Sequence, residues 1–327
     1  MNQSPQLGAF DTQTRLPRLG NGVGRAHGKV ILFGEHAVVY GAPAISFPVG
    51  VLPVIANASL VVGESTLESE LYRGPVAQAP ARLAPVLAAI DAALDAAAPG
   101  LGAKVAIYSD IPYERGLGSS AAISSAVIEA IYRAAGHHLS REERFDLTQT
   151  AERVAHGHPS GMDAHAVTAN SVIKFEKPVV TPVAVGAPFY FVIADSGLKG
   201  STRQAVNEVR MLRETSPHYA IPRITELGNI AERAESYFRN GRAVTMGLAM
   251  WRAHSLLKDI GVSSQSLDTL VAAAHQAGAL GAKLTGGGIG GCVVALAGSR
   301  AEADRVRTGL LNAGAKNAWV TTLEPTK

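Results

Sequence analysis

Cysteine, charged residues and aromatic residues are all scarce in this sequence of 327 residues. Cys292 is the single cysteine, so no disulfide can form within the chain, and we expect a reducing compartment. The net charge is only +3, and no run of lysine and arginine is long enough to follow a phosphate backbone. Nucleic acid is therefore not an expected partner, whereas a modest positive charge suits small anionic ligands.

Long uninterrupted apolar runs are missing as well. Prolines and glycines interrupt the apolar stretch 45–62, which is typical of successive strands and turns and not of a membrane-spanning helix. The first 24 residues contain no apolar core of the kind found in signal peptides. These absences predict a cytoplasmic protein without a membrane partner, with a flexible tail over residues 1–24.

Apolar residues make up 47% of the sequence, which is typical of a folded globular protein. The chain is long enough for two domains. The segment 177–188 contains three prolines and little periodicity, so we place the boundary there, between an N-terminal domain over 25–183 and a C-terminal domain over 184–327. Helix and strand patterns are mixed without regular alternation, which predicts an α+β fold.

Residue spacing predicts the individual elements. Apolar residues recur at helical spacing over 81–98, 121–135, 202–213, 221–238, 243–258 and 267–277. Ser140 with Glu143, and Ser299 with Glu302, have the spacing of a capping box, which predicts the starts of two further helices. Strands are predicted over 29–33, 49–62, 104–108, 171–175, 189–194, 282–285 and 292–297.

Glycine, in contrast, is abundant, and the segment Gly-Leu-Gly-Ser-Ser-Ala-Ala at 116–122 directly precedes an apolar helix. A helix start carries free N–H groups and a partial positive charge, and glycine lets a ligand approach the backbone closely. Ser119 and Ser120 can contact a phosphate or its metal, although an ordinary serine-capped helix is the alternative. The segment is not a Walker A loop, because no GxxxxGK[ST] pattern occurs in the chain.

A second glycine cluster lies between two predicted strands, with five glycines among residues 286–291. A hairpin turn needs only one or two glycines. The cluster therefore indicates backbone amides that approach an anionic ligand. A flexible linker is the alternative, but the flanking strands argue against it.

Five charged or titratable side chains lie near these loops or at element ends. Lys29 begins an apolar strand, and Glu35 follows the glycine at which that strand should end, together with His36. Glu152 lies before, and Asp163 after, the turn segment Gly-His-Pro-Ser-Gly at 157–161. Two carboxylates near a phosphate can divide the work, one binding Mg²⁺ and one facing an acceptor hydroxyl. The alternative is structural: Glu152 pairs with an exposed arginine and Asp163 caps a helix.

Taken together and in this order, the segments resemble the GHMP kinase superfamily and, within it, the mevalonate kinase family, over most of the chain from Gly28 onward. The three signatures correspond to residues 28–36, 116–122 and 285–291. The first signature and the segment His-Gly-His-Pro-Ser-Gly-Met-Asp at 156–163 are the more particular to mevalonate kinases. Two positions depart from the family pattern: His27 replaces a usual proline, and Gly287 replaces a common alanine.

The resemblance implies a role for individual residues. Lys29 and Asp163 would be catalytic, and Ser120 and Glu152 would ligate Mg²⁺. Mevalonate would be held by Glu35, His36 and Ser160. ATP would be held by Gly116, Leu117, Gly118, Ser119, Ser120, Ala121, Thr202, Gly286, Gly287 and Gly288.

The resemblance also implies a fold and a reaction. The fold is an S5-like N-terminal domain and a ferredoxin-like C-terminal domain with ATP between them, and a homodimer is compatible with it. The reaction is the ATP- and Mg²⁺-dependent phosphorylation of the C5 hydroxyl of (R)-mevalonate in isoprenoid biosynthesis, in which Asp163 either accepts the hydroxyl proton or only orients the hydroxyl. Two alternatives are a GHMP kinase for phosphomevalonate, homoserine or a sugar, and a non-catalytic ATP-binding sensor.

Overall fold

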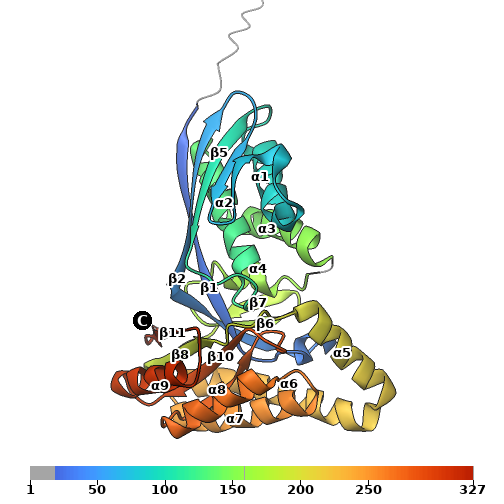
Figure 1. The fold of residues 1–327 in the computed structure, drawn as a ribbon, viewed down its shortest axis with the longest axis vertical. Coiled ribbons are helices and arrows are strands. Elements are labelled where there is room, and N and C mark those ends of the chain that lie inside the picture. Colours follow the sequence, from blue (N-terminus) through green and yellow to red (C-terminus); the bar gives the residue numbers. More distant parts are fainter. Residues whose placement is uncertain (1–18, 158, 327) are drawn as a thin grey trace, which may run out of the picture.

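Two sheets form the framework of the molecule (Figure 1). In the computed structural model, which describes residues 19–157 and 159–326, the larger sheet has seven strands and the smaller sheet has four. The larger sheet has the order β4-β3-β5-β2-β6-β7, with β1 paired to β2. Its strands are β1 (Asn21–Phe33), β2 (Ala44–Val61), β3 (Thr66–Ser69), β4 (Tyr72–Pro75), β5 (Gly102–Ser109), β6 (Ile173–Glu176) and β7 (Val179–Pro182).

The smaller sheet is antiparallel, with the order β11-β8-β10-β9. Its strands are β8 (Phe189–Asp195), β9 (Gly281–Thr285), β10 (Cys292–Ala297) and β11 (Asn317–Leu323). A helical segment connects β8 to β9, a glycine turn connects β9 to β10, and a single helix connects β10 to β11. This is the connectivity of a ferredoxin-like domain, so the prediction of an α+β fold with such a C-terminal half is confirmed.

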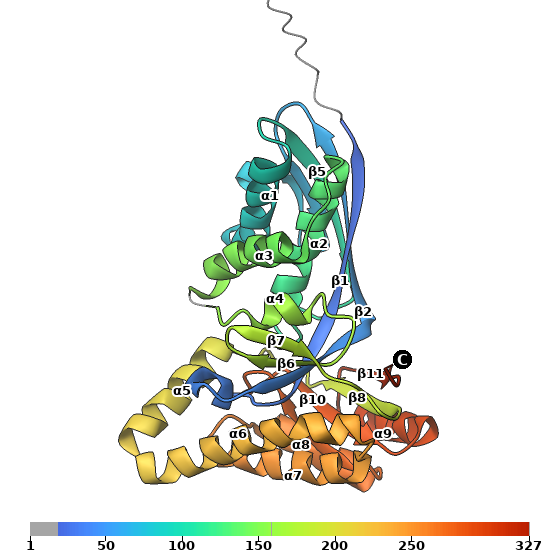
Figure 2. The ribbon, with the colours of Figure 1, turned by 180° about the vertical axis from the view of Figure 1, so that it is seen from behind.

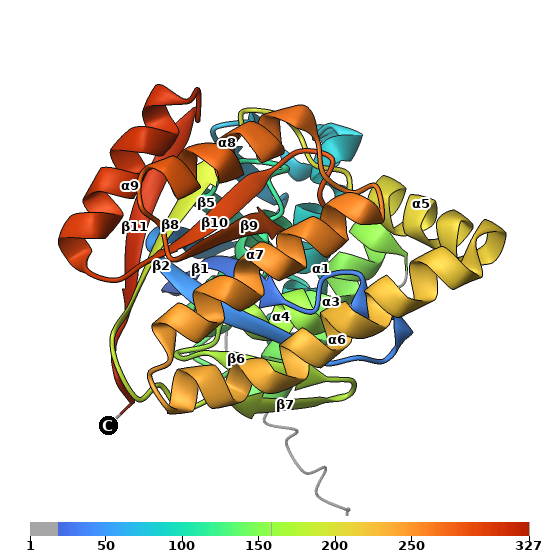
Figure 3. The same cartoon turned by 90° about the horizontal axis from the view of Figure 1, so that it is seen from below.

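Helices cover one face of each sheet. α2 packs directly on β1 and β2, and α1 and α3 pack on α2 (Figure 2). On the smaller sheet, α7 and α8 contact β9 and α9 contacts β8, so these helices line its outer face (Figure 3). The helices are α1 (Ala84–Ala97), α2 (Ser119–Ala134), α3 (Arg141–His156), α4 (Met162–Ala166), α5 (Thr202–Thr215), α6 (Pro217–Arg239), α7 (Ala243–Asp259), α8 (Gln265–Gln276) and α9 (Arg300–Asn312).

The helices predicted from apolar spacing all form, with ends that differ by a few residues. Ser140 accepts a hydrogen bond from the N–H of Glu143 and the Glu143 side chain bonds back to Ser140, which is the predicted capping box. Ser299 caps α9 through the N–H of Glu302. Over the part of the chain that the structure describes, no helix is long and apolar enough to cross a membrane.

The two sheets share one apolar core. Phe47 of β2 stacks on Phe191 of β8, with 4.6 Å between ring centroids, and both belong to a single cluster of buried residues that spans the two sheets. The expected domain boundary near residue 183 lies between β7, in the larger sheet, and β8, in the smaller one. The division into two domains at this point stays a prediction.

Two expectations for the N-terminal region were wrong. Residues 21–24 do not belong to a tail but begin β1, while residues 1–18 lie outside the described residues. The glycines here serve close packing: a Cβ on Gly22 would lie 2.1 Å from the carbonyl oxygen of Ala130, and one on Gly24 only 1.9 Å from that of Ala126. The strand can approach α2 this closely because the side chains are absent.

The stretch 45–62 is also not a series of strands and turns, because Ala44–Val61 forms the single strand β2. Pro53 lies opposite His27, next to an irregularity in the register between His27 and Gly28. Proline is tolerated where a ladder is irregular, since the missing N–H then costs no regular hydrogen bond. Proline alone was therefore a poor indicator of a strand end.

The contact between β1 and α2 gives a first prediction. Gly24→Ala should lower the free energy of unfolding by at least about 2 kcal/mol, because the new methyl group overlaps the α2 backbone and cannot rotate away. Denaturant unfolding measures the effect. Gly50→Ala is the matched control. Gly50 lies in β2, and no neighbouring atom lies within 4 Å of a Cβ added to it, so the free energy of unfolding of this variant should stay near that of the parent protein. Equal stability of the two variants would contradict this packing argument.

Candidate active site

The segment 116–118 forms a tight loop at the start of α2. Gly116 and Gly118 both have positive φ values, of 76° and 78°, which favour glycine. Gly118 is the N-cap of α2 and has no side chain with which to cap it. The alternative of a serine-capped helix is therefore wrong, and the first N–H groups of α2 keep the character of an anion site.

Lys29 lies against this loop. From β1, its backbone N–H donates to the carbonyl of Leu117 at 3.0 Å, and its ammonium donates to the carbonyl of Gly116 at 3.2 Å. The ammonium also lies 3.0 Å from Oδ1 of Asp163, at the start of α4. Lys29 is buried, whereas the Asp163 side chain is 36% exposed. A buried cation thus joins the glycine loop to a carboxylate that a ligand can reach.

Ser120 and Glu152 form a second polar pair beside the loop. The Ser120 hydroxyl, on α2, donates to Oε1 of Glu152 on α3 at 2.7 Å. Glu152 is only 2% exposed, so its carboxylate is buried. Hydroxyl and carboxylate oxygens are the donors that Mg²⁺ prefers. In residues 19–157 and 159–326 no cluster of three or more His, Cys, Asp or Glu side chains is placed to hold a metal ion.

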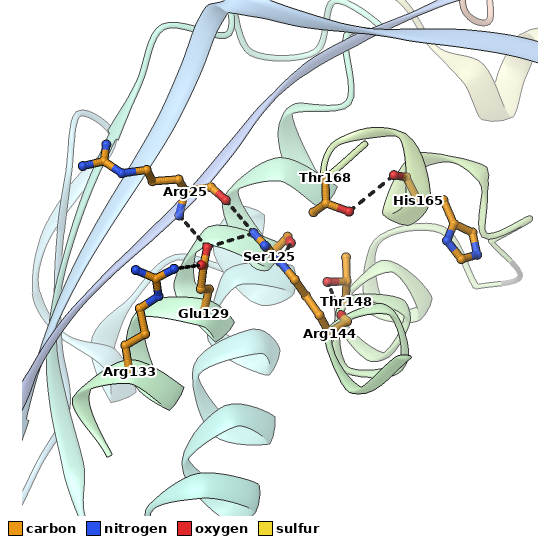
Figure 4. Close-up of polar contacts among 8 residues, drawn as sticks. All are labelled: Arg25, Ser125, Glu129, Arg133, Arg144, Thr148, His165 and Thr168. Carbon is orange, nitrogen blue, oxygen red and sulfur yellow. Dashed lines mark hydrogen bonds and ion pairs between the residues drawn. The ribbon is translucent and has the colours of Figure 1, made fainter. Parts of the chain in front are cut away.

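A network around Arg144 fixes α3, and with it Glu152 (Figure 4). The Arg144 guanidinium lies 3.2 Å from Glu129 and donates to the Ser125 hydroxyl at 2.7 Å, both on α2. It also donates to the backbone carbonyl of Arg25 on β1. Glu129 in turn accepts the N–H of Arg25 at 2.8 Å. These contacts hold α3, which carries Glu152, against both β1 and α2, the two elements next to the glycine loop 116–118.

Glu35 and His36 lie at the turn between β1 and the 3-10 helix η1 (Ala37–Tyr40), and both are buried. His36 Nε2 is 2.9 Å from the carbonyl oxygen of Gly287. Burial lowers the pKa of His36 to about 4, so the ring is neutral at physiological pH. Since a carbonyl only accepts, Nε2 carries the proton and Nδ1 is an acceptor. In the described part of the chain, His36 Nδ1 and Glu35 Oε2 are buried with no hydrogen-bond partner.

The glycine cluster between β9 and β10 completes the site. A Cβ on Gly286 would lie 3.3 Å from the carbonyl oxygen of Gly116, so the two glycine loops meet. A Cβ on Gly287 would lie 2.7 Å from Cα of Thr202, the first residue of α5. This contact explains why glycine stands at 287 here, where the family commonly has alanine. Gly288 has a φ of 87° and packs on the carbonyl of Val262.

Within the described part of the chain, the remaining predicted residues form no side-chain hydrogen bond or ion pair with Lys29, Glu35 or Asp163. Leu117 and Ala121 are buried in the apolar core, so only their backbones can face a ligand. Ser119 is the first residue of α2 and is half-buried. Ser160 is exposed, and its hydroxyl accepts the N–H of Met162 at 3.3 Å.

Sequence reasoning missed two charged residues at the site. Arg115 is largely buried, and its Nε lies 2.8 Å from Oδ1 of Asp195 at the end of β8, which links the glycine loop to the smaller sheet. Lys283 of β9 is fully buried and forms an ion pair with Glu35. A charged residue next to a glycine loop or within an apolar strand was the available signal in each case.

Comparison with known proteins identifies the family of this chain. The family described as GHMP kinases N terminal domain matches residues 84–170, and GHMP kinases C terminal matches residues 234–316. A mevalonate kinase from Thermococcus gammatolerans is 36% identical over 297 residues, covering 83% of this chain and 88% of that protein. One from Pyrococcus furiosus is 35% identical, with 84% and 89% covered. The crystal structure of L. major mevalonate kinase in complex with R-mevalonate has a TM-score of 0.81 and 29% identity, with 95% and 99% covered.

Proposed function

This chain belongs to the GHMP kinases, in the mevalonate kinase family, and we propose that it transfers the γ-phosphoryl group of ATP to the C5 hydroxyl of (R)-mevalonate. The product is 5-phosphomevalonate. One observation above all supports this function: the Lys29 ammonium lies within 3.2 Å of both the Gly116 carbonyl and the Asp163 carboxylate. Phosphoryl transfer to an alcohol needs a positive charge beside the phosphates and a group that positions the hydroxyl, and a cation between a glycine loop and a carboxylate suits both needs.

Phosphoryl transfer needs accurate positioning and stabilisation of charge more than covalent help from the protein. The amides at the start of α2 and in the cluster 286–291 hold the phosphates of ATP. Lys29 stabilises the negative charge of the transferring group. Asp163 faces the acceptor hydroxyl, which it orients and whose proton it takes. Glu35 and His36 offer buried acceptor atoms to the rest of the substrate.

We assign a magnesium ion to Ser120 and Glu152, whose oxygens suit it. When bound with ATP, Mg²⁺ would neutralise charge on the phosphates.

Glu152→Gln should raise the Mg²⁺ concentration needed for half-maximal activity about tenfold or more, because an amide oxygen carries no charge to attract the ion. Titration of activity with Mg²⁺ measures this. Glu142→Gln, exposed on the same helix, is the control. An unchanged titration for Glu152→Gln would make Glu152 a structural residue.

The substrate is tested with an ADP-release assay on mevalonate, phosphomevalonate, homoserine and galactose. Turnover with mevalonate alone is the expected result. Turnover with another acceptor would support the proposed phosphate-binding residues but would contradict the proposal that Glu35 and His36 bind mevalonate. ATP binding without turnover on any acceptor would favour an ATP-binding sensor. A homodimer and a cytoplasmic location, without nucleic-acid or membrane partners, stay predictions of their own.

A further inference from the structure

A fully buried lysine lies next to Glu35, one of the residues that we propose bind the substrate. Lys283 lies in β9 with none of its side chain exposed, and its ammonium contacts Oε1 of Glu35. It also donates a hydrogen bond to the backbone carbonyl of Leu284 at 2.6 Å. Glu35 and Lys283 are 248 residues apart in the sequence, and their contact joins the turn after β1 to the smaller sheet.

Two charges are buried together only when each neutralises the other. Burial has the largest effect and raises the pKa of the Glu35 carboxyl above its ordinary value, while Lys283 and, to a smaller extent, the Glu35 backbone N–H and Lys29 of β1 lower it. The other titratable groups that face this pair are His36 and, from α7, His254. Burial lowers the pKa of both rings to about 4, so both are neutral at physiological pH. Lys283 is therefore the main source of positive charge beside Glu35.

One oxygen of the Glu35 carboxylate is used by Lys283 and the other is not. Oε2 is buried and has no hydrogen-bond partner within residues 19–157 and 159–326. An ionised carboxylate oxygen can only accept, so it requires a donor such as a hydroxyl group. A protonated carboxyl is a weaker acceptor, and a proton on Oε2 would make that atom a donor to the substrate hydroxyl and no longer an acceptor from it.

We propose that Lys283 is a positioning residue, which keeps the Glu35 carboxylate ionised and fixed so that Oε2 accepts a hydrogen bond from a hydroxyl of the acceptor substrate. The inference rests on the proposed function, since it concerns how the same site binds its alcohol. Lys283 does not touch the substrate itself and acts through Glu35.

Lys283→Met tests the proposal through the pH dependence of binding. Without Lys283, the pKa of the buried Glu35 should rise further, so more of the carboxyl is protonated at the acidic end of the assay range and it ionises as the pH rises. The KM for mevalonate should therefore increase about tenfold or more at pH 6.5 and fall toward the parent value by pH 9, while the KM for ATP stays within about twofold. The parent enzyme should show no such change. Lys174→Met is the matched control, because Lys174 is another buried strand lysine, and its partners, Glu176 and Glu232, are not among the proposed site residues.

A second variant keeps the test decisive if Lys283→Met folds poorly. Glu35→Gln with Lys283→Met removes both buried charges, and it should have a raised KM for mevalonate that does not depend on pH. It should also be no worse than Glu35→Gln alone, since Lys283 acts through Glu35. Additive losses, or an equal fall in affinity for ATP and mevalonate without pH dependence, would overturn the proposal. Failure of the proposed function is seen separately, as a parent enzyme that does not turn over mevalonate.

Discussion

Asp163→Asn is expected to lower kcat with mevalonate by about a thousandfold while ATP binding stays nearly unchanged. Asp163 is partly exposed beside the buried Lys29, so its carboxylate is available to an acceptor hydroxyl. A positioned base contributes about 10²–10⁴ to the rate. Asparagine has nearly the same shape and can still accept a hydrogen bond, but it cannot take a proton under these conditions. The substitution therefore removes proton transfer and leaves orientation in place.

Two measurements check this expectation: kcat from the ADP-release assay and the affinity for ATP from calorimetry. Asp146→Asn is the control, because Asp146 is an exposed aspartate on α3. A loss of only about tenfold would mean that Asp163 orients the hydroxyl without accepting its proton. Turnover close to that of the parent would remove Asp163 from the reaction altogether.

The sequence was most informative where the site is built from short contiguous segments. The glycines at 116–118 and 286–288 are needed for positive φ values and for close contact between loops, and both requirements leave a trace in the composition of a few neighbouring residues. Capping pairs such as Ser140 with Glu143 are equally local. These features could be predicted because the physical reason for each residue lies within a few positions of it.

The features that were missed depend on partners far away in the sequence. The short hairpin β3–β4 and the strand β7 are held by pairing with β5 and β6, and their own residues carry little periodic signal. Residues 20–24 were predicted to belong to a flexible tail, yet their glycines allow contact with α2, more than 100 residues further on. Lys283 likewise has its partner at Glu35. A single sequence contains no direct information about such distant contacts.

The site itself lies where the two sheets meet. The larger sheet and its helices carry Lys29, Ser120 and Asp163. The smaller sheet and its helices carry Thr202 and the cluster 286–291. The Thr285 hydroxyl donates to the carbonyl of Ile31 at 2.8 Å, next to the contact of His36 with Gly287. Bonds across the junction thus help to fix the distance between the two glycine loops, where we propose that the phosphates bind.

Lys29→Met is expected to lower kcat by about a thousandfold or more, because removal of a cation from the transferring phosphoryl group costs as much as the loss of other charged groups in this role. Methionine lacks the charge, is only one heavy atom shorter than lysine and suits the buried position of the stem. Lysine cannot be replaced well by arginine, since Nζ lies within 3.2 Å of two oxygens and a Cβ at Gly118 would already be 2.9 Å from Lys29 Cγ. The exposed Lys104 of β5 provides the control, Lys104→Met, with unchanged kcat.

The double variant, Lys29→Met with Asp163→Asn, decides whether the ion pair acts as one unit. If the ammonium holds the carboxylate toward the hydroxyl as well as stabilising the phosphoryl group, each single substitution already disables the pair. The double variant should then be only slightly slower than the slower single variant, as found for groups that act together. If the two losses multiply instead, Lys29 and Asp163 contribute independently, and their separation of 3.0 Å reflects packing without shared function. Thermal unfolding of all three variants, compared with the parent, establishes that the kinetic losses are not losses of fold.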